Sequence, residues 1–331
     1  MKSEARYYNQ SEGHVTCLLC PHGCRLKDGQ SGLCNNRYNN KGILFTNNYG
    51  EVVSLNIDPI EKKPLYHFHP GGEILSIGGF GCNFTCLFCQ NHHISQAEIQ
   101  DQYREKTSPE KIVAKAIELQ PKAGIAFTYN EPLINFEFIT DTLTLAKMQN
   151  IATVLISNGY VNPSPLKQLL EITDAFNIDL KGFDNEFYEK FTGGKLHPVL
   201  KTIETIAKSG KHLEITHLLV TEANDNSKDF TNMCRWIADH AGKQVPLHVS
   251  RYFPNYHYGA QATNTDILDQ FLNIATQHLD FVYAGNYKAQ TDTICPACGT
   301  KIIERNGYNV KTIGLNGKNC LNCRIELPII L

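Results

Sequence analysis

A short loop with three cysteines constrains this chain more than any other feature of its sequence. Cys82, Cys86 and Cys89 have the spacing C-x3-C-x2-C, and the aromatic residue Phe88 precedes the third cysteine. The apolar run 74–80 before them ends in glycines and predicts a buried strand, so the thiols should lie on a loop leaving that strand. Three thiolates on one loop favour an iron–sulfur cluster over structural zinc, which usually takes four protein ligands. A cubane held by three cysteines leaves one iron open to another ligand.

Two other interpretations of these thiols stay open from the spacing alone: a zinc knuckle with a distant fourth ligand, and three unrelated cysteines. The motif resembles the signature of the radical S-adenosylmethionine (SAM) enzymes. This resemblance implies that Cys82, Cys86 and Cys89 hold a catalytic 4Fe–4S cluster whose open iron binds SAM. In that family the reduced cluster cleaves SAM, and the resulting 5′-deoxyadenosyl radical abstracts hydrogen from a substrate.

The composition of the 331-residue chain suits one large α/β barrel with small appendages. Hydrophobic residues make up 42%, enough for a sizeable core, and the net charge of −2 does not point to a nucleic-acid partner or an anionic membrane. The sequence has no apolar run long enough to span a bilayer. The first residues are polar and lack the apolar core of a signal peptide, so we expect a cytoplasmic protein.

Twelve cysteines, eleven of them in three clusters, predict metal sites rather than disulfides in a chain without an export signal. The first cluster has the spacing C-x2-C-x3-C-x9-C and consists of Cys17, Cys20, Cys24 and Cys34. A segment this short buries little core, so a metal should hold it together. Four thiolates suit zinc or a second 4Fe–4S cluster; we expect zinc and keep the cluster as the alternative. The nearby His14 and His22 are expected to be solvated rather than to replace a ligand.

The last cysteine cluster consists of two C-x2-C pairs, Cys295, Cys298, Cys320 and Cys323. Between the pairs, residues 301–305 and 308–313 are predicted to be strands joined at Asn306-Gly307. Two such knuckles on hairpins predict a zinc ribbon, with a rubredoxin-like iron site as the alternative. The remaining cysteine, Cys234, is expected to be an ordinary side chain of a helix.

A segment just before the cysteine loop, residues 58–71, is unusually rich in ionisable groups and too irregular for a helix. These groups are Asp58, Glu61, Lys62, Lys63, His67 and His69. The segment could form a lid or an active-site wall, or a hydrogen-bonded cover over one end of the barrel. We expect the cover.

From residue 108 onward, predicted helices and strands alternate, which indicates parallel strands covered by helices in a closed or partial barrel. After the strand at 74–80, further strands are expected at 124–128, 152–156, 175–180, 212–220, 247–250 and 280–284. Helices are expected from Ser108-Pro109, and at 134–149, 165–172, 197–209, 227–240 and 266–278. The radical SAM resemblance, over about 70–285, implies a partial (β/α)6 barrel. We predict three domains: an N-terminal four-cysteine metal-binding module at 1–45, the barrel at 46–290 and a zinc-ribbon-like module at 291–331.

Polar residues at the carboxyl ends of barrel strands are the site candidates, because catalytic groups on such folds lie there. Resemblance to the Gly-Gly-Glu-Pro segment of the family makes Glu131 a contact for the SAM amino group, although Tyr129 and Asn130 replace the glycines. Further along, Ser157-Asn158-Gly159 and Asp179-Leu180-Lys181 resemble the Thr-Asn-Gly and Leu-Asp-Leu-Lys segments of the activases of glycyl-radical enzymes. Ile156 replaces the acid that helps those activases hold a cation, so we do not predict a cation site.

Asp179 and Lys181 lie two residues apart and share one strand face, where SAM's ribose and carboxylate are plausible partners. The alternative is a buried ion pair that braces the barrel. Glu214, His248 and Arg251 are further candidates, each with a satisfied core polar group as the alternative. The complete set of predicted cofactor contacts is Phe88, Asn91, Asn130, Glu131, Ser157, Asn158, Asp179, Lys181, Glu214, His248 and Arg251.

A closer resemblance runs nearly end to end, to the radical SAM enzyme of the AmmeMemoRadiSam system. It rests on the N-terminal Cys-x-x-Cys-Pro cluster, the segment 58–68, the cysteine loop with Gln90-Asn91, Glu214-Ile-Thr, Pro246-Leu-His and the C-terminal Cys-Pro-x-Cys. The resemblance implies partners of the Memo and AMMECR types and an electron donor such as flavodoxin or ferredoxin; it does not reveal the substrate.

Three functions are compatible with these features. The first is a radical SAM enzyme for a small molecule or lipid precursor, and the second is an activase that installs a glycyl radical in a protein. We prefer the first, since an activase needs an open cleft for a peptide loop and the terminal modules could crowd it. The third is a non-catalytic metal-binding scaffold, against which the complete cysteine loop argues.

Overall fold

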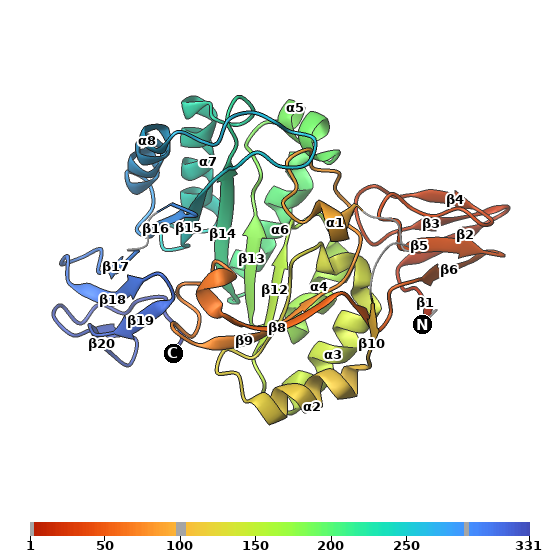
Figure 1. Cartoon of the computed structure of the whole chain (residues 1–331), viewed down its shortest axis with the longest axis horizontal. Helices are drawn as coiled ribbons and strands as arrows, with labels where there is room; N and C mark the ends of the chain where they lie inside the picture. The colour runs from red at the N-terminus through yellow and green to blue at the C-terminus, as the bar shows by residue number, and fades with distance from the viewer. Residues whose placement is uncertain (1–2, 97–103, 288–290) are drawn as a thin grey trace.

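An eight-stranded sheet forms the centre of the computed structural model, which describes residues 3–96, 104–287 and 291–331 (Figure 1). The sheet order is β16-β15-β14-β13-β12-β11-β9-β8, and all neighbours are parallel except the edge pair of β8 and β9. The parallel strands are β9 (Glu73–Gly78), β11 (Ile125–Phe127), β12 (Thr153–Ser157), β13 (Ala175–Asp179), β14 (His212–Leu219), β15 (Leu247–Arg251) and β16 (Val282–Gly285). Since the edge strands β8 (Ser54–Pro59) and β16 are not paired with each other, this sheet is an open, partial barrel.

Helices alternate with these strands as the sequence predicts. They are α2 (Pro109–Leu119), α3 (Phe136–Met148), α4 (Pro163–Ile172), α6 (Leu196–Lys208), α7 (Ser227–His240) and α8 (Thr265–Thr276). Local signals set their starts: Ser108 caps α2 by accepting a hydrogen bond from the backbone N–H of Lys111, and Asn226 caps α7 in the same way. Each helix buries one apolar stripe, such as Val199, Ile203 and Ile206 of α6, in the main core.

The opposite face of the sheet is closed at the amino ends of its strands by the ionisable segment. Ile60, Leu65 and Phe68 pack there against strand residues such as Val154 and Ala175. Several polar groups of the segment are hydrogen-bonded: Asp58 accepts from Lys62 and Lys63, Glu61 Oε1 accepts from the backbone N–H of Gly71, and His67 Nε2 pairs with the Tyr283 hydroxyl. The segment therefore covers the amino ends of the strands, as expected, while Glu61, Lys62 and Tyr66 also border a cleft, which is the wall that the sequence left as the alternative.

Several elements differ from the sequence-based prediction. The edge strand β8 (Ser54–Pro59) pairs with β9 and extends into the first two residues of the segment 58–71, which was expected to be irregular. The turn at 47–50 lies between β6 (Ile43–Thr46) and β7 (Glu51–Val52), which pair with different partners; β7 pairs with β10 (Glu105–Lys106). After β13, the short α5 (Asn185–Phe187) and a π-helical turn (Tyr188–Thr192) were not predicted.

Small antiparallel sheets flank the barrel on opposite sides (Figure 1). On the N-terminal side they are formed by β1 (Ser3–Glu4), β2 (Tyr8–Ser11), β3 (His14–Cys17), β4 (Arg25–Lys27), β5 (Arg37–Asn40) and β6. On the C-terminal side they are formed by β17 (Thr293–Ile294), β18 (Lys301–Asn306), β19 (Asn309–Thr312), β20 (Leu315–Asn316) and β21 (Asn319–Cys320). The β18–β19 turn falls at the predicted Asn306-Gly307. Among the described residues, no helix is both long and apolar enough to cross a membrane.

A buried ion pair joins the N-terminal sheets to the barrel. The side chains of Arg37 and Glu137 are 1% and 3% exposed, and the guanidinium donates to the Glu137 carboxylate. Arg37 also donates to the backbone oxygen of Arg6, whose own N–H donates to Glu137 at 2.7 Å. By contrast, the Arg6 side chain forms an exposed ion pair with Asp141 at 3.1 Å.

The two arginines make a matched pair for testing this connection. Arg37→Met should lower the free energy of unfolding by about 3–5 kcal/mol, because it leaves the Glu137 charge buried without its partner. Arg6→Met should cost less than about 1 kcal/mol, since it removes an exposed pair. Denaturant unfolding of both variants measures the difference, and equal costs would contradict the role given to the buried pair.

Candidate active site and metal centres

The three-cysteine loop leaves the carboxyl end of β9 and is held by segments from distant parts of the chain. Its backbone N–H groups at Thr85 and Leu87 donate to the oxygens of Thr192 and Phe191, at 2.8 and 3.0 Å. The Leu87 oxygen accepts from the N–H of His257 at 2.9 Å. The loop therefore sits at the carboxyl edge of the parallel sheet, as predicted, and is fixed on several sides.

The sulfurs of the loop have polar neighbours. Cys82 Sγ lies 3.3 Å from the backbone nitrogen of Phe84, and Cys89 Sγ lies 3.1 Å from Ser95 Oγ, in the short helix α1 (His92–Ser95). Burial raises the pKa of Cys86 to about 12, and it raises that of Cys82 well above its usual value. Ligation to iron would favour the thiolate form of these thiols, and three soft ligands on one loop suit an iron–sulfur cluster.

Glu131 joins the ends of two neighbouring strands beside this loop. Its carboxylate, which is buried, accepts from Ser157 Oγ at 2.9 Å and from the backbone N–H of Asn158 at 2.8 Å. Burial raises the pKa of Glu131 to about 7, against the effect of these hydrogen bonds. The Asn158 amide continues the network, donating to Asn83 Oδ1 at 2.8 Å and lying 3.8 Å from Cys82 Sγ. The structure thus brings these predicted residues together.

The residues that replace the family's glycines connect the strand end to the cysteine loop. Tyr129 adopts a φ of 73°, a left-handed conformation that glycine accommodates more easily. The side chain of Asn130 accepts from the N–H of Gly79 and donates to the oxygen of Gly81, at 3.0 and 2.9 Å. Asn91 donates to the Tyr129 oxygen at 2.6 Å. The Asn130 side chain therefore has a positioning role between the end of β11 and the cysteine loop.

Asp179 and Lys181 form an ion pair of 2.8 Å at the end of β13, with side chains 32% and 18% exposed. Burial opposes the charge of Lys181, but the nearby Asp179 and Cys86 groups raise the pKa of the ammonium. This pair is neither deeply buried nor fully solvated, so it can still meet a polar ligand beside Cys86. On the same side, Phe88 stacks on Phe187 with ring centroids 6.2 Å apart.

Glu214 and His248 lie in a closed network instead. The Glu214 carboxylate, 0% exposed, accepts from His248 Nε2 at 2.6 Å, from His212 Nε2 at 2.9 Å and from the backbone N–H groups of Tyr66 and His67. Burial alone would raise the pKa of Glu214, but the hydrogen bonds from the two histidines hold it well below its usual value. This network matches the satisfied core group that the sequence left as the alternative for both residues. The environment of Glu214 therefore argues against the predicted SAM contact, whereas His248 also borders the cleft at the ends of β15 and β16.

Arg251, the last residue of β15, donates through Nε to the oxygen of Thr263 at 2.8 Å, and its guanidinium stacks on Phe253. Beside it, a cleft of about 390 Å³ opens along the carboxyl ends of β15 and β16. The cleft lies between these strand ends, the cover segment and the tip of the C-terminal hairpin. Its lining includes Glu61, Lys62, Tyr66, Ser250, Asn286 and Tyr308.

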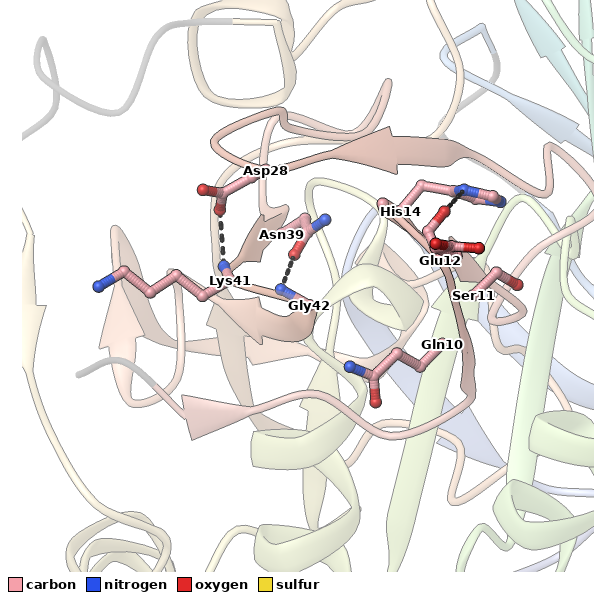
Figure 2. Close-up of a pocket in the computed structure, with 9 residues that line it drawn as sticks. Gln10, Ser11, Glu12, His14, Asp28, Asn39, Lys41 and Gly42 are labelled. Atoms are coloured by element: carbon pink, nitrogen blue, oxygen red, sulfur yellow. Dashed lines mark hydrogen bonds between the residues drawn. The ribbon is translucent and has the colours of Figure 1, made fainter.

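A second hollow, of about 720 Å³, lies among the N-terminal hairpins (Figure 2). Three of its polar side chains form hydrogen bonds with nearby backbone groups. Asp28 accepts from the N–H of Lys41, Asn39 accepts from the N–H of Gly42, and the His14 ring pairs with the backbone oxygen of Glu12. Because these groups are already satisfied by backbone, we assign no chemistry to this hollow.

The C-terminal cysteines gather closely. Cys295 Sγ and Cys323 Sγ lie 3.6 Å apart, and Cys298 Sγ and Cys320 Sγ lie 3.7 Å apart. Among the described residues, these four cysteines form the one group of at least three Cys, His, Asp or Glu ligand atoms that all lie within 4.8 Å of one another. Four sulfurs around one zinc at about 2.3 Å stand about 3.8 Å apart, so this set fits a single tetrahedral ion.

Some site residues were missed by sequence reasoning. Asn83 bridges Asn158 and His22, whose Nε2 lies 2.7 Å from the Asn83 oxygen. The Tyr129 hydroxyl donates to Asp58, and Lys63 lies 4.1 Å from the centre of the Tyr129 ring. The position of Asn83 between two loop cysteines was the signal available for the first; no local pattern links residues 58 and 129.

An open parallel α/β barrel with a three-cysteine loop at its carboxyl edge defines the class of protein, and comparisons identify its family. Residues 76–237 match the model of the Radical SAM superfamily. An uncharacterized protein of Methanocaldococcus jannaschii is 41% identical over 336 residues, which cover 99% of each chain. The chain belongs to the radical SAM superfamily.

More distant relatives share part of the length. The Pyruvate formate-lyase 1-activating enzyme of Escherichia coli is 24% identical over 154 residues, 44% of this chain and 61% of that enzyme. Among solved structures, a radical SAM methyltransferase from Sphaerobacter thermophilus has a TM-score of 0.52 at 14% identity, covering 71% of each chain. Streptococcus suis SuiB bound to S-adenosylmethionine has a TM-score of 0.51 at 12% identity, covering 64% of this chain and 52% of that one. At these identities, the two structures show the fold alone.

Substitution of Glu214 distinguishes a structural role of this residue from a role in binding SAM. Glu214→Gln should lower the free energy of unfolding by about 3–5 kcal/mol, because an amide donor then faces a set of donors in the core. The exposed Glu222→Gln is the matched control and should change little. Denaturant unfolding gives the cost, and equilibrium binding of SAM to the folded fraction should be unchanged. A stable variant that has lost SAM binding would contradict this interpretation.

Proposed function

We propose that this chain is a radical SAM enzyme that cleaves SAM at a 4Fe–4S cluster on Cys82, Cys86 and Cys89 and abstracts hydrogen from a small-molecule or lipid-precursor substrate. One observation carries the proposal: three buried or partly buried thiols on one fixed loop at the carboxyl edge of a parallel barrel. The other cysteines lie in the two terminal modules and, for Cys234, inside α7. Three thiolates from the loop leave a coordination position for SAM.

When bound, the cluster and SAM supply the electron and the radical; the chain holds, orients and shields them. The loop thiolates hold three irons, and the Asn158 amide fixes the position of Cys82. The buried Glu131 carboxylate, which accepts from Ser157 Oγ and from the backbone N–H groups of Leu133 and Asn158, orients the strand ends beside the loop. The Asp179–Lys181 pair offers partners for the ribose and carboxylate of SAM. Phe88 and Phe187 supply an apolar wall that keeps water from a reactive intermediate.

The cleft beside β15 and β16 supports a small substrate. Its volume of about 390 Å³ lies in the range of small-molecule pockets. Tyr66, Ser250, Asn286 and Tyr308 give it hydroxyl and amide groups, so a substrate with several oxygen functions would suit it. Gly307 and Tyr308 of the C-terminal hairpin line one side of it, so the hairpin occupies space that a peptide loop of an activase substrate would need.

The C-terminal cysteines, in this proposal, bind zinc in a ribbon-like module that extends over about 291–331, beside a barrel at 46–290 and an N-terminal module at 1–45. Sulfur separations of 3.6 and 3.7 Å support zinc there. The partners we propose are a flavodoxin or ferredoxin as electron donor, and proteins of the Memo and AMMECR types, on the strength of the end-to-end sequence resemblance.

An activase of glycyl-radical enzymes is the second candidate. The similarity to pyruvate formate-lyase activating enzymes of Escherichia coli and Clostridium pasteurianum favours it. These matches cover 44% and 47% of this chain, so they support the chemistry better than the substrate. A non-catalytic scaffold remains the third hypothesis that the experiment must separate.

The test is anaerobic reconstitution of the full chain with iron and sulfide, followed by dithionite and SAM, with 5′-deoxyadenosine measured by chromatography. Wild-type protein should form 5′-deoxyadenosine, and Cys86→Ala should fall to the background because one iron loses its ligand. Cys234→Ala, which removes a thiol buried in α7, is the matched control and should retain the product.

Two outcomes would change the proposal. A reconstituted chain that binds zinc alone and never forms deoxyadenosine would support the scaffold. A stable glycyl-radical signal that this chain generates by electron paramagnetic resonance (EPR) in a co-expressed protein would support the activase over the small-molecule enzyme.

A further inference from the structure

The four N-terminal cysteines surround one cavity, but their sulfurs are spread apart. Cys17, Cys20, Cys24 and Cys34 line it together with Leu19, His22, Arg37, Asn83 and Ile134. In the part of the chain that the structure describes, no three of these sulfurs lie within 4.8 Å of one another, whereas all four C-terminal sulfurs do. The same donor set therefore occurs twice in this protein with two different spacings.

The spacing discriminates between two kinds of metal centre. Four thiolates on one zinc ion must converge until they nearly touch, with about 3.8 Å between sulfurs. A cubane puts its four irons at separate corners, so its thiolates stand farther apart and enclose a larger volume. The C-terminal set has the first arrangement. The N-terminal sulfurs do not converge in this way, which favours the second arrangement for them.

The surroundings of the N-terminal set support four cysteine ligands rather than a mixed site. His22 uses its Nε2 for the backbone oxygen of Asn83 at 2.7 Å, and His14 pairs with a backbone oxygen elsewhere in the module. The buried guanidinium of Arg37, which pairs with Glu137 through Nη2, directs Nη1 toward Cys17 Sγ at 3.8 Å, so a cationic N–H group faces one of the thiolates. Such a charge stabilises an anionic cluster in an apolar cavity.

We propose that Cys17, Cys20, Cys24 and Cys34 bind a second 4Fe–4S cluster, and that this cluster passes electrons to the one on the catalytic loop. The assignment replaces the zinc that the sequence led us to expect. With four thiolates, every iron of this cluster is ligated, so it has no open position for SAM or substrate and its chemistry is electron transfer.

The two cysteine sites are in direct contact through the chain. At Gly81, which precedes Cys82 and has a φ of 83°, a Cβ atom would lie 2.6 Å from the backbone oxygen of Cys34. Asn83, which follows Cys82, lines the N-terminal cavity. Its side-chain oxygen accepts a hydrogen bond from the Asn158 amide, and the same amide lies near Cys82 Sγ. Only glycine permits this approach of the Cys34 loop to the catalytic loop.

One electron passes from an external donor through the N-terminal cluster to the catalytic cluster. This step rests on the function proposed above. A one-electron donor of the flavodoxin or ferredoxin class reduces the N-terminal cluster from the 2+ to the 1+ state. The N-terminal cluster then reduces the catalytic cluster by the same one electron and returns to 2+. No proton or other group moves, and each turn needs one electron from the donor.

The experiment compares metal content and EPR spectra of three anaerobically reconstituted full-length proteins. Wild type should contain about eight irons, eight sulfides and one zinc per chain. The variant Cys82→Ala/Cys86→Ala/Cys89→Ala lacks the catalytic site and should keep about four irons, one zinc and the EPR signal of a reduced 4Fe–4S cluster. The variant Cys20→Ala/Cys24→Ala should also keep about four irons and one zinc, with the catalytic cluster alone.

The metal content of the catalytic-site variant identifies the metal at the N-terminal cysteines, even if the N-terminal variant fails to fold. An iron-free triple variant with about two zincs per chain would overturn the proposal while leaving the radical SAM function intact. An iron-free wild type would instead contradict the proposed function. For electron transfer, the fully reduced wild type should show spin coupling between two nearby clusters, and a spectrum equal to the sum of the two variants would overturn the relay.

Discussion

Three sulfur atoms must be held in place before a cluster can be bound, and a loop with so few residues between its cysteines cannot do this alone. The rest of the barrel edge supplies the constraint. Asn130 ties the start of the loop to the end of β11, and Asn158, at the end of β12, contacts Cys82 and Asn83. Glu131 joins these two strand ends through Ser157 and Asn158. The sheet therefore positions the metal ligands through amides and one carboxylate.

The two ends of the barrel interior differ in the side chains that line them. At the amino ends of the strands, Ile60, Leu65 and Phe68 fill the space, and Glu214 anchors the backbone of the cover segment. At the carboxyl ends, polar side chains surround the cysteine loop and border a cleft. Filling one end with apolar and fully paired groups leaves the other end for chemistry, as is usual in parallel barrels.

Much of this arrangement could be predicted from the sequence, because local signals determine it. Capping residues and apolar periodicity gave the helices, including α7 at its predicted bounds, and the cysteine spacing placed the catalytic loop. The polar residues 130, 131, 157 and 158 were recognised because they follow predicted strands.

The features that the sequence leaves undetermined depend on contacts between distant segments. A carboxylate such as Glu214 looks the same in sequence whether it faces a ligand or four donors of the core. The edge strand β8 exists because β9 lies beside it, although its own side chains are mixed. The choice between zinc and a cluster at Cys17, Cys20, Cys24 and Cys34 depends on sulfur separations, which the linear spacing does not fix.

The central claim is that the catalytic loop leaves one iron free to bind SAM. Its most direct test is electron–nuclear double resonance on the reduced N-terminal variant Cys20→Ala/Cys24→Ala, mixed with SAM labelled with ¹⁵N at the amino group and ¹⁷O at the carboxylate. The account predicts magnetic coupling of both labels to the cluster. A reduced cluster whose spectrum does not change when labelled SAM is added would contradict the claim that one iron binds SAM.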